Sequence, residues 1–248
     1  MFRKEYRNRW KIITPITTNI MENFPYIDTD RSDELALCGE IMESVINYIN
    51  TNADQIVDNI DQESIDVYIF LKSEFKKSDV TMNPLFQFVF RSFYRLDNAG
   101  LTPEFKDEYF KILQSVRSEV SIDILEIVEK LYSFPNRKGQ NSLQFSFVTK
   151  MINMIDDSVP IYDSEVAKVF NFRPPYHSKG FGKRLELFIE FHQFLKKNYI
   201  SILENKKLNP AFEKMKKKFK NIGKLPKTKM LDFLIWSAGK VKSKFYKR

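Results

Sequence analysis

Cysteine and histidine are both scarce in this chain of 248 residues. Cys38 is the one cysteine, so no disulfide can form within the chain, and a reducing compartment such as the cytoplasm is the expected location. Together with His177 and His192, this thiol is too small a set for a structural zinc site. We therefore expect a fold held together by its apolar core, with no bound metal.

Glycine is also rare, with seven residues in the whole chain. Gly180 and Gly182 begin a dinucleotide-binding pattern, but Leu185 stands where its third glycine is required. No Gly-Lys pair has the earlier glycine of a Walker A loop, and no G-x-S-x-G nucleophile elbow occurs. The sequence thus argues against the common nucleotide-binding loops and against α/β-hydrolase chemistry, and we expect no cofactor.

Long hydrophobic runs are missing as well. The longest ones, such as residues 67–71, fall far short of the roughly 18 to 20 residues that span a bilayer. Residues 1–13 are basic, but the apolar stretch of a signal peptide does not follow them. We expect a soluble cytoplasmic protein without a transmembrane segment.

Apolar residues make up 43% of the chain and recur mostly at three- and four-residue spacing, while strict alternation is nearly absent. This pattern predicts an all-α, multi-helix globular protein with no substantial sheet. Asn83-Pro84 and Thr102-Pro103 each combine a capping side chain with a proline that suits the first helical turn. The predicted helices cover about residues 33–50, 64–76, 83–96, 102–117, 121–132, 142–156, 163–170, 183–205, 210–221 and 228–244, with a short extended stretch at 159–162.

Positive charge is concentrated in the last part of the chain. Residues 200–248 contain 15 Lys or Arg and 3 Asp or Glu, a net charge of +12, whereas residues 1–199 contain 25 and 29, a net charge of −4. We therefore divide the chain into a helical core, residues 1–199, and a basic helical C-terminal region, residues 200–248, that packs on it. A concentrated positive surface attracts polyanions, so this region predicts binding to DNA or RNA.

The candidate nucleic-acid contacts are lysines of this C-terminal region. They are Lys214, Lys216, Lys217, Lys218, Lys220, Lys227, Lys229, Lys240, Lys242 and Lys244. Other interpretations stay open: the last helix could dock into the core with a solvated basic end, or lie on an anionic membrane surface. In a third, the protein is a non-enzymatic protein-interaction module whose lysines only keep it soluble.

A family resemblance lies in residues 123–170. They run as helix, polar turn (F-P-N-R-K-G-Q), helix, short apolar stretch, and then V-P-I-Y-D-S-E-V at the start of the next helix. In this order and spacing the segment resembles the core of the helix-hairpin-helix DNA glycosylases. The resemblance implies a glycosylase-like fold over about residues 83–170, in which Asp163 stabilises positive charge on the sugar while a flipped base is removed. The segment also resembles a motif of bacterial helical proteins that have no settled activity.

The segment departs from the glycosylase pattern in its hairpin. With Asp163 fixed, Asn141 and Leu143 stand at the glycine positions, and Phe145 stands where the lyase-type members carry a lysine. The resemblance therefore implies a monofunctional glycosylase, which releases a base without cutting the strand. Lys150 could supply an amine only if the register shifted by five residues.

The candidate pocket residues around Asp163 are Tyr162, Tyr176, His177 and Lys150. Asp163 also has a purely structural interpretation, since an aspartate at the start of a helix caps its first amides. His192 lies among apolar residues of a predicted helix, and we expect it to be packed there rather than catalytic.

Overall fold

The computed structural model describes residues 31–119 and 121–245, and the side chains of residues 39–119 and 121–243. It is 74% helical, which confirms the predicted all-α class. Within the described residues there is no strand, only two isolated β-bridges, Leu101–Asn136 and Pro135–Asn141. Residues 1–13, interpreted above from their charge, lie outside this part of the chain.

The helices follow the predicted order, with two differences. In chain order, the α-helices of the described residues are α2 (Arg31–Thr51), α3 (Ala53–Asp58), α4 (Gln62–Lys77), α5 (Pro84–Tyr94), α6 (Pro103–Ser115), α7 (Ile124–Tyr132), α8 (Phe145–Ile155), α9 (Ser164–Val169), α10 (Gly180–Glu204), α11 (Asn209–Lys218) and α12 (Lys227–Phe245). The short helix α3 was not predicted. α10 begins at Gly180, so two glycines that we expected in a loop belong to its first turn.

The predicted capping residues begin their helices as expected. The Asn83 side chain accepts a hydrogen bond from the N–H of Phe86 at 2.9 Å, and Pro84 opens α5. The Thr102 hydroxyl accepts from the N–H of Phe105 at 3.3 Å at the start of α6. Each cap satisfies an amide that the helix itself leaves without a partner, which is why these two boundaries could be read from the sequence.

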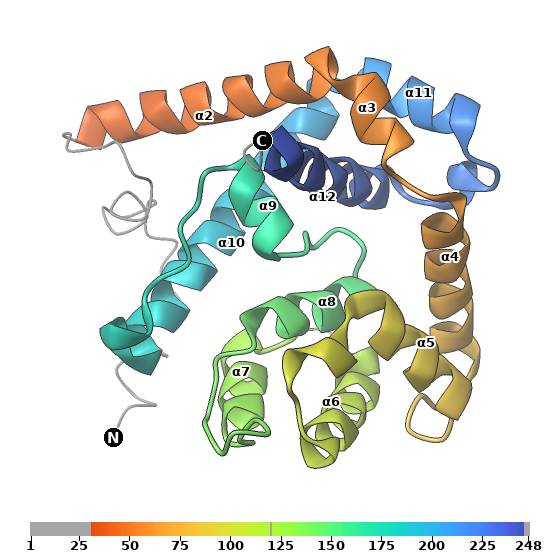
Figure 1. Cartoon of the computed structure of the whole chain (residues 1–248), viewed down its shortest axis with the longest axis vertical. Helices are drawn as coiled ribbons and strands as arrows, with labels where there is room; N and C mark the ends of the chain where they lie inside the picture. The colour runs from red at the N-terminus through yellow and green to blue at the C-terminus, as the bar shows by residue number, and fades with distance from the viewer. Residues whose placement is uncertain (1–30, 120, 246–248) are drawn as a thin grey trace.

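Figure 1 shows two groups of helices. α12 runs through the first group, with α2, α3 and α11 along one side and α9 and α10 along another. α5, α6, α7 and α8 form the second group, and α4 runs along the edge of the molecule between the two. The groups meet where α8 of the second group hydrogen-bonds to α12 of the first.

The last helix is part of the core. α12 packs most extensively on α9 and also contacts α2, α3 and α10. Its apolar face, from Leu231 to Val241, has no exposed surface at Leu231, Leu234, Ile235, Ala238 and Val241. The domain boundary that we predicted at residues 199/200 falls inside α10, so it does not coincide with the end of a helix.

Candidate functional site

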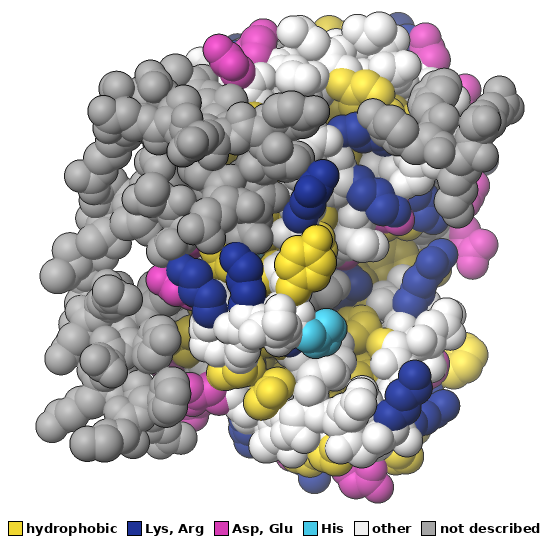
Figure 2. Space-filling model, turned by 60° about the vertical axis from the view of Figure 1, so that its left-hand side comes forward, with side chains coloured by type: hydrophobic (Ala, Val, Ile, Leu, Met, Phe, Trp, Pro, Cys, Tyr) yellow, Lys and Arg dark blue, Asp and Glu magenta, His cyan; other side chains and the backbone are white. Residues whose placement is uncertain are grey.

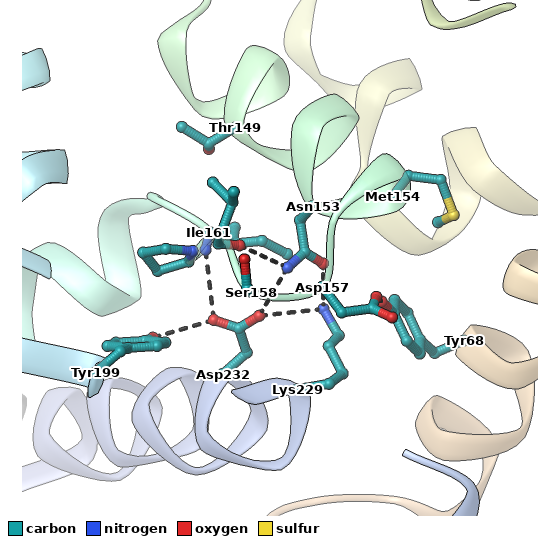
Figure 3. A network of polar contacts seen from close by, with 12 residues as sticks. Tyr68, Thr149, Asn153, Met154, Asp157, Ser158, Ile161, Tyr199, Lys229 and Asp232 are labelled. Atoms are coloured by element: carbon teal, nitrogen blue, oxygen red, sulfur yellow. Dashed lines mark hydrogen bonds and ion pairs between the residues drawn. The ribbon is translucent and has the colours of Figure 1, made fainter. Parts of the chain in front are cut away.

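A buried network of polar side chains joins the two groups of helices (Figure 3). Its centre is the Asp232 carboxylate, whose residue is 6% exposed. Oδ1 accepts hydrogen bonds from the Tyr199 hydroxyl at 3.0 Å and from the N–H of Ile161 at 3.3 Å. Oδ2 accepts from the Asn153 amide at 3.2 Å and from the Lys229 amine at 3.5 Å. A buried carboxylate is costly unless it is paired and hydrogen-bonded, and here four donors surround it.

Lys229 is the cationic partner in this network. Its amine also donates to Asn153 Oδ1 at 3.0 Å and lies 4.2 Å from the centre of the Tyr68 ring. Burial lowers the pKa of Lys229, and the Asp232 carboxylate opposes that shift. Because Lys229 is 2% exposed, our prediction that it contacts nucleic acid at the surface is wrong.

The network holds the backbone of residues 159–162, which connect α8 to α9. We call this segment the arm. The Val159 carbonyl accepts a hydrogen bond from the Asn153 amide at 2.7 Å, and the Pro160 carbonyl accepts one from His192 Nε2 at 2.8 Å. The N–H of Ile161 donates to Asp232 at 3.3 Å. The Thr149 hydroxyl lies 3.1 Å from the N–H and 3.3 Å from the carbonyl of Tyr162. The extended stretch predicted at these positions is therefore a coil segment held by side chains from α8, α10 and α12.

His192 is buried in α10, in agreement with the packed position expected for it. Its Nε2 faces the carbonyl of Pro160, which can only accept a hydrogen bond, so Nε2 carries the proton. Burial lowers the pKa of His192 to about 4. The ring is thus neutral at physiological pH and supports the arm.

Asp163 directly follows the arm and caps α9. Its Oδ1 accepts hydrogen bonds from the N–H groups of Glu165 at 2.9 Å and of Val166 at 3.0 Å. The structural role considered from the sequence is therefore present. Since both cap hydrogen bonds use Oδ1, Oδ2 lies outside the cap.

Lys150 of α8 carries an amine on which the Asp163 carboxylate acts electrostatically. Its Nζ lies 4.9 Å from the centre of the Phe147 ring and 5.9 Å from that of Tyr94. Burial lowers the pKa of Lys150, the Asp163 carboxylate raises it in part, and the positive charge of Arg95 lowers it further. Lys150 is consequently easier to deprotonate than an ordinary lysine and has a carboxylate within electrostatic reach.

Two more cations complete the cluster. The Lys240 amine of α12 lies 3.9 Å from the centre of the Trp236 ring. Burial and the charge of Arg95 lower its pKa, and the carboxylates of Glu165 and Asp163 raise it. Arg95 itself ends α5 in the left-handed conformation, with φ of 60°. We call Arg95, Lys150, Asp163 and Lys240 the Lys150–Asp163 site.

A buried tyrosine beside this site has an unused polar group. Tyr94 is buried, and its hydroxyl has no hydrogen-bond partner within the part of the chain that the structure describes. Burial raises its pKa well above the usual tyrosine range, and the carboxylates of Asp232 and Asp157 add to that shift. A neutral hydroxyl donor thus lies between the buried network and Lys150.

The turn between α7 and α8 forms a small hairpin. The N–H of Asn136 donates to the Gln140 carbonyl at 2.8 Å, and the Asn136 side chain accepts from the N–H groups of Lys138 at 2.9 Å and Gln140 at 3.1 Å. Gly139 takes φ of 73°, a conformation that other residues rarely adopt. The hairpin leaves Arg137 and Lys138 exposed.

The remaining pocket candidates are not brought together with Asp163. Tyr162 is 6% exposed and packs against the rings of Phe145 (5.8 Å) and Phe188 (5.0 Å), so it lies in the core instead of lining an open pocket. Tyr176 is 74% exposed. His177 is also exposed, in the short turn that precedes α10.

The lysines predicted to bind nucleic acid fall into different environments. Lys214 and Lys218 form ion pairs with Asp54 and Asp58 of α3, and Lys216 pairs with Glu213 at 2.7 Å. Exposed residues of this set are Lys216, Lys217, Lys218, Lys220 and Lys227. Lys242 donates to the Lys168 carbonyl at 3.0 Å and to Asn171 Oδ1 at 2.8 Å, so it caps the end of α9. The side chain of Lys244 lies outside the described residues.

Two further searches bear on what the protein can hold. Among the residues whose positions are described, no three His, Cys, Asp or Glu side chains come together in a way that could hold a metal ion. None of the helices described above is long and apolar enough to cross a membrane.

No family model, curated protein or solved structure matches this chain. Its function therefore has to be argued from the site itself.

Proposed function

We propose that the protein binds nucleic acid and cleaves the N-glycosidic bond of a bound nucleotide, with Lys150 as nucleophile and Asp163 as the assisting carboxylate. One observation carries the proposal: an amine whose pKa is lowered by burial lies within electrostatic reach of a carboxylate fixed at the start of a helix. Lysines used as nucleophiles need such surroundings, because only the neutral amine can attack.

The chemistry would proceed in one displacement. The neutral Lys150 amine forms a bond to C1′ of the sugar as the bond from C1′ to the base breaks, and the base leaves with the bonding electrons and takes up a proton. Asp163 Oδ2 stabilises the positive charge that develops on the sugar. The nitrogen supplies the proton that the departing base takes up, and the bond from C1′ to O4′ then breaks as O4′ takes up a proton from water, which leaves a protonated Schiff base between Lys150 and C1′. Loss of a proton from C2′ then expels the phosphate on C3′, and this β-elimination cuts the strand.

Positive charge around the site supports nucleic acid as the ligand. Arg95 and Lys240 act electrostatically on one another, and Asp163 acts on Lys240. Away from the site, the hairpin between α7 and α8 exposes two further cations, Arg137 and Lys138. In the view of Figure 2, Lys and Arg side chains stand around a recessed area of the face on the α10 side, next to apolar side chains. Cations that neutralise phosphates, beside apolar surface that can take a base, suit a nucleic-acid interface.

Borohydride trapping tests the reaction, because it reduces a Schiff base to a stable amine. The substrates are duplexes with uracil, an alkylated purine, oxidised guanine or an abasic site. We expect the wild-type protein to become covalently linked to at least one duplex, and the Lys150→Met variant to none. Lys111→Met, which removes an exposed lysine of α6 outside the candidate contacts, is the matched control and should react as the wild type does.

Asp163→Asn tests the carboxylate apart from its capping role, because asparagine caps helices about as well as aspartate. It should slow trapping strongly and leave the affinity for DNA unchanged. If no duplex is trapped and alkali reveals no lost base, the enzymatic part of the proposal is refuted, and salt-dependent DNA binding alone would leave a binding protein. Absence of binding even at about 50 mM salt would refute both parts.

A further inference from the structure

We infer that Thr149, Asn153 and Asp232 are positioning residues, which hold the arm and with it Asp163, the residue that follows the arm. The effect of these residues on the reaction rests on the proposed function, but the placement of Asp163 can be tested without nucleic acid. This placement gives a role in the reaction to a network that lies away from the reacting atoms.

The first step concerns the backbone of the arm. A buried coil segment cannot satisfy its own N–H and carbonyl groups, and each unpaired group costs free energy. In the arm, all four residues have a backbone group bonded to a buried side chain of another element. The arm is consequently fixed at each residue, which is unusual for a connection without secondary structure.

The second step concerns register. The Thr149 hydroxyl accepts a hydrogen bond from the N–H of Tyr162 at 3.1 Å, and its one proton lies between the Ser146 carbonyl at 3.0 Å and the Tyr162 carbonyl at 3.3 Å. Lys150 directly follows Thr149, and Asp163 directly follows Tyr162. The hydrogen bond from Tyr162 to Thr149 therefore fixes the backbone just before Asp163 against the turn of α8 that carries Lys150.

The third step concerns the other end of the arm. Asn153 lies one helical turn beyond Lys150, and its amide donates both to the Val159 carbonyl at 2.7 Å and to Asp232 at 3.2 Å. Figure 3 shows Asp232 between this amide, the arm and Tyr199. None of these network side chains has a buried polar atom without a partner in the described part of the chain. Because every member of this network is hydrogen-bonded, its side chains have a single favourable arrangement. They therefore hold the arm in a single conformation.

Two matched variants separate positioning from stability. Thr149→Val removes a buried hydroxyl that bonds the arm, whereas Ser237→Ala removes a buried hydroxyl of α12 that bonds the Ile56 carbonyl and lies outside the network. Both should lower the thermal midpoint by a few degrees, since each costs about 1 kcal/mol or somewhat more. We expect only Thr149→Val to slow trapping by about tenfold or more, because small displacements of reacting groups are costly.

The pH dependence of Lys150 gives a readout that needs no nucleic acid. Acetic anhydride labels neutral amines, and peptide mass spectrometry gives the labelled fraction of Lys150 across a pH series, with exposed Lys220 as the internal reference. The charged groups that act on Lys150 are Asp163, Arg95 and Lys229. Asp163 raises its pKa, so a displaced Asp163 should move the labelling midpoint of Thr149→Val to lower pH.

General loosening would act in the opposite direction, because water reaching the amine brings its pKa back up. Ser237→Ala should keep the wild-type midpoint. The inference is overturned if Thr149→Val keeps that midpoint too, or if its midpoint rises. Failure of the proposed function has a different signature, namely that the wild-type protein traps no duplex while the labelling midpoints still differ as expected.

Discussion

α11 and α12 are both rich in lysine, yet their lysines have opposite environments. On α11, Lys214 and Lys218 reach across the surface to acidic residues of α3. On α12, Lys229 is buried against Asp232, while Lys240 lies on an indole ring. The helices belong to one basic region of the sequence, but among the lysines with described side chains three are exposed on α11 and only Lys227, at the first residue, is exposed on α12.

The difference shows that the net charge of a segment does not tell which of its charged residues are exposed to solvent. The carboxylates of α3 partly neutralise the charge of α11, and Lys207, just before α11, pairs with Glu43 of α2 at 2.8 Å. On α12, buried Lys229 donates to a carboxylate, and half-buried Lys242 caps a neighbouring helix. The +12 of the region is therefore a poor measure of the surface that a polyanion meets.

Of the variants that test this comparison, Lys229→Met should lower the free energy of unfolding the most. Methionine fills a similar volume but leaves Asp232 buried without its cation, and breaking a buried pair in this way typically costs about 3–5 kcal/mol. Urea denaturation measures the loss. A loss below about 1 kcal/mol would mean that Asp232 is protonated in the folded protein and that the ion pair contributes little.

Gly239→Ala should have an intermediate effect. A Cβ atom at this position of α12 would lie 2.2 Å from the carbonyl oxygen of Glu165 in α9, so the two helices would have to separate. Overpacking of this kind costs about 1–3 kcal/mol. Gly223→Ala is the control, because nothing lies within 4 Å of a Cβ placed there. Equal stability of the two variants would contradict the close contact between α9 and α12.

Lys214→Ala on α11 should have the smallest effect. Its partner Asp54 is 83% exposed, and such surface pairs contribute less than about 1 kcal/mol. Salt screens exposed charges, so the difference from the wild type should shrink further in about 1 M salt. Thermal unfolding at two salt concentrations measures it. A loss as large as that of Lys229→Met would remove the contrast between the two helices.

The sequence predicted the features that depend on neighbouring residues. The all-α class followed from apolar spacing, and the caps at Asn83 and Thr102 followed from short-range hydrogen bonding. Asp163 was recognised as a helix start for the same reason. Local patterns are sufficient here because a cap and its amides lie within three residues of each other.

The same patterns could not predict which lysines turn inward. Lys229 was placed at the surface because it stands in a basic region, yet Asp232 follows it by one helical turn and has apolar neighbours on both sides. An aspartate between apolar residues was the sequence signal that Asp232 is buried and needs a buried cation such as Lys229. Lys150 and Asp163 were harder to pair, because the arm between α8 and α9 has no periodicity from which its path could be predicted.

The hydrogen bonds of the arm also determine the stage of chain synthesis at which the site can form. Asn153 and Asp232 are 79 residues apart, so α8, α9 and the arm are made well before α12. Chains fold from the N-terminal side as they are made, and contacts between distant residues form later than helices do. Until α12 arrives, the N–H of Ile161 lacks its Asp232 partner, and side chains of α8 and α10 alone hold the arm. A newly made chain thus gains its first helices early, and the buried contacts of Asp232 and most of its excess positive charge last.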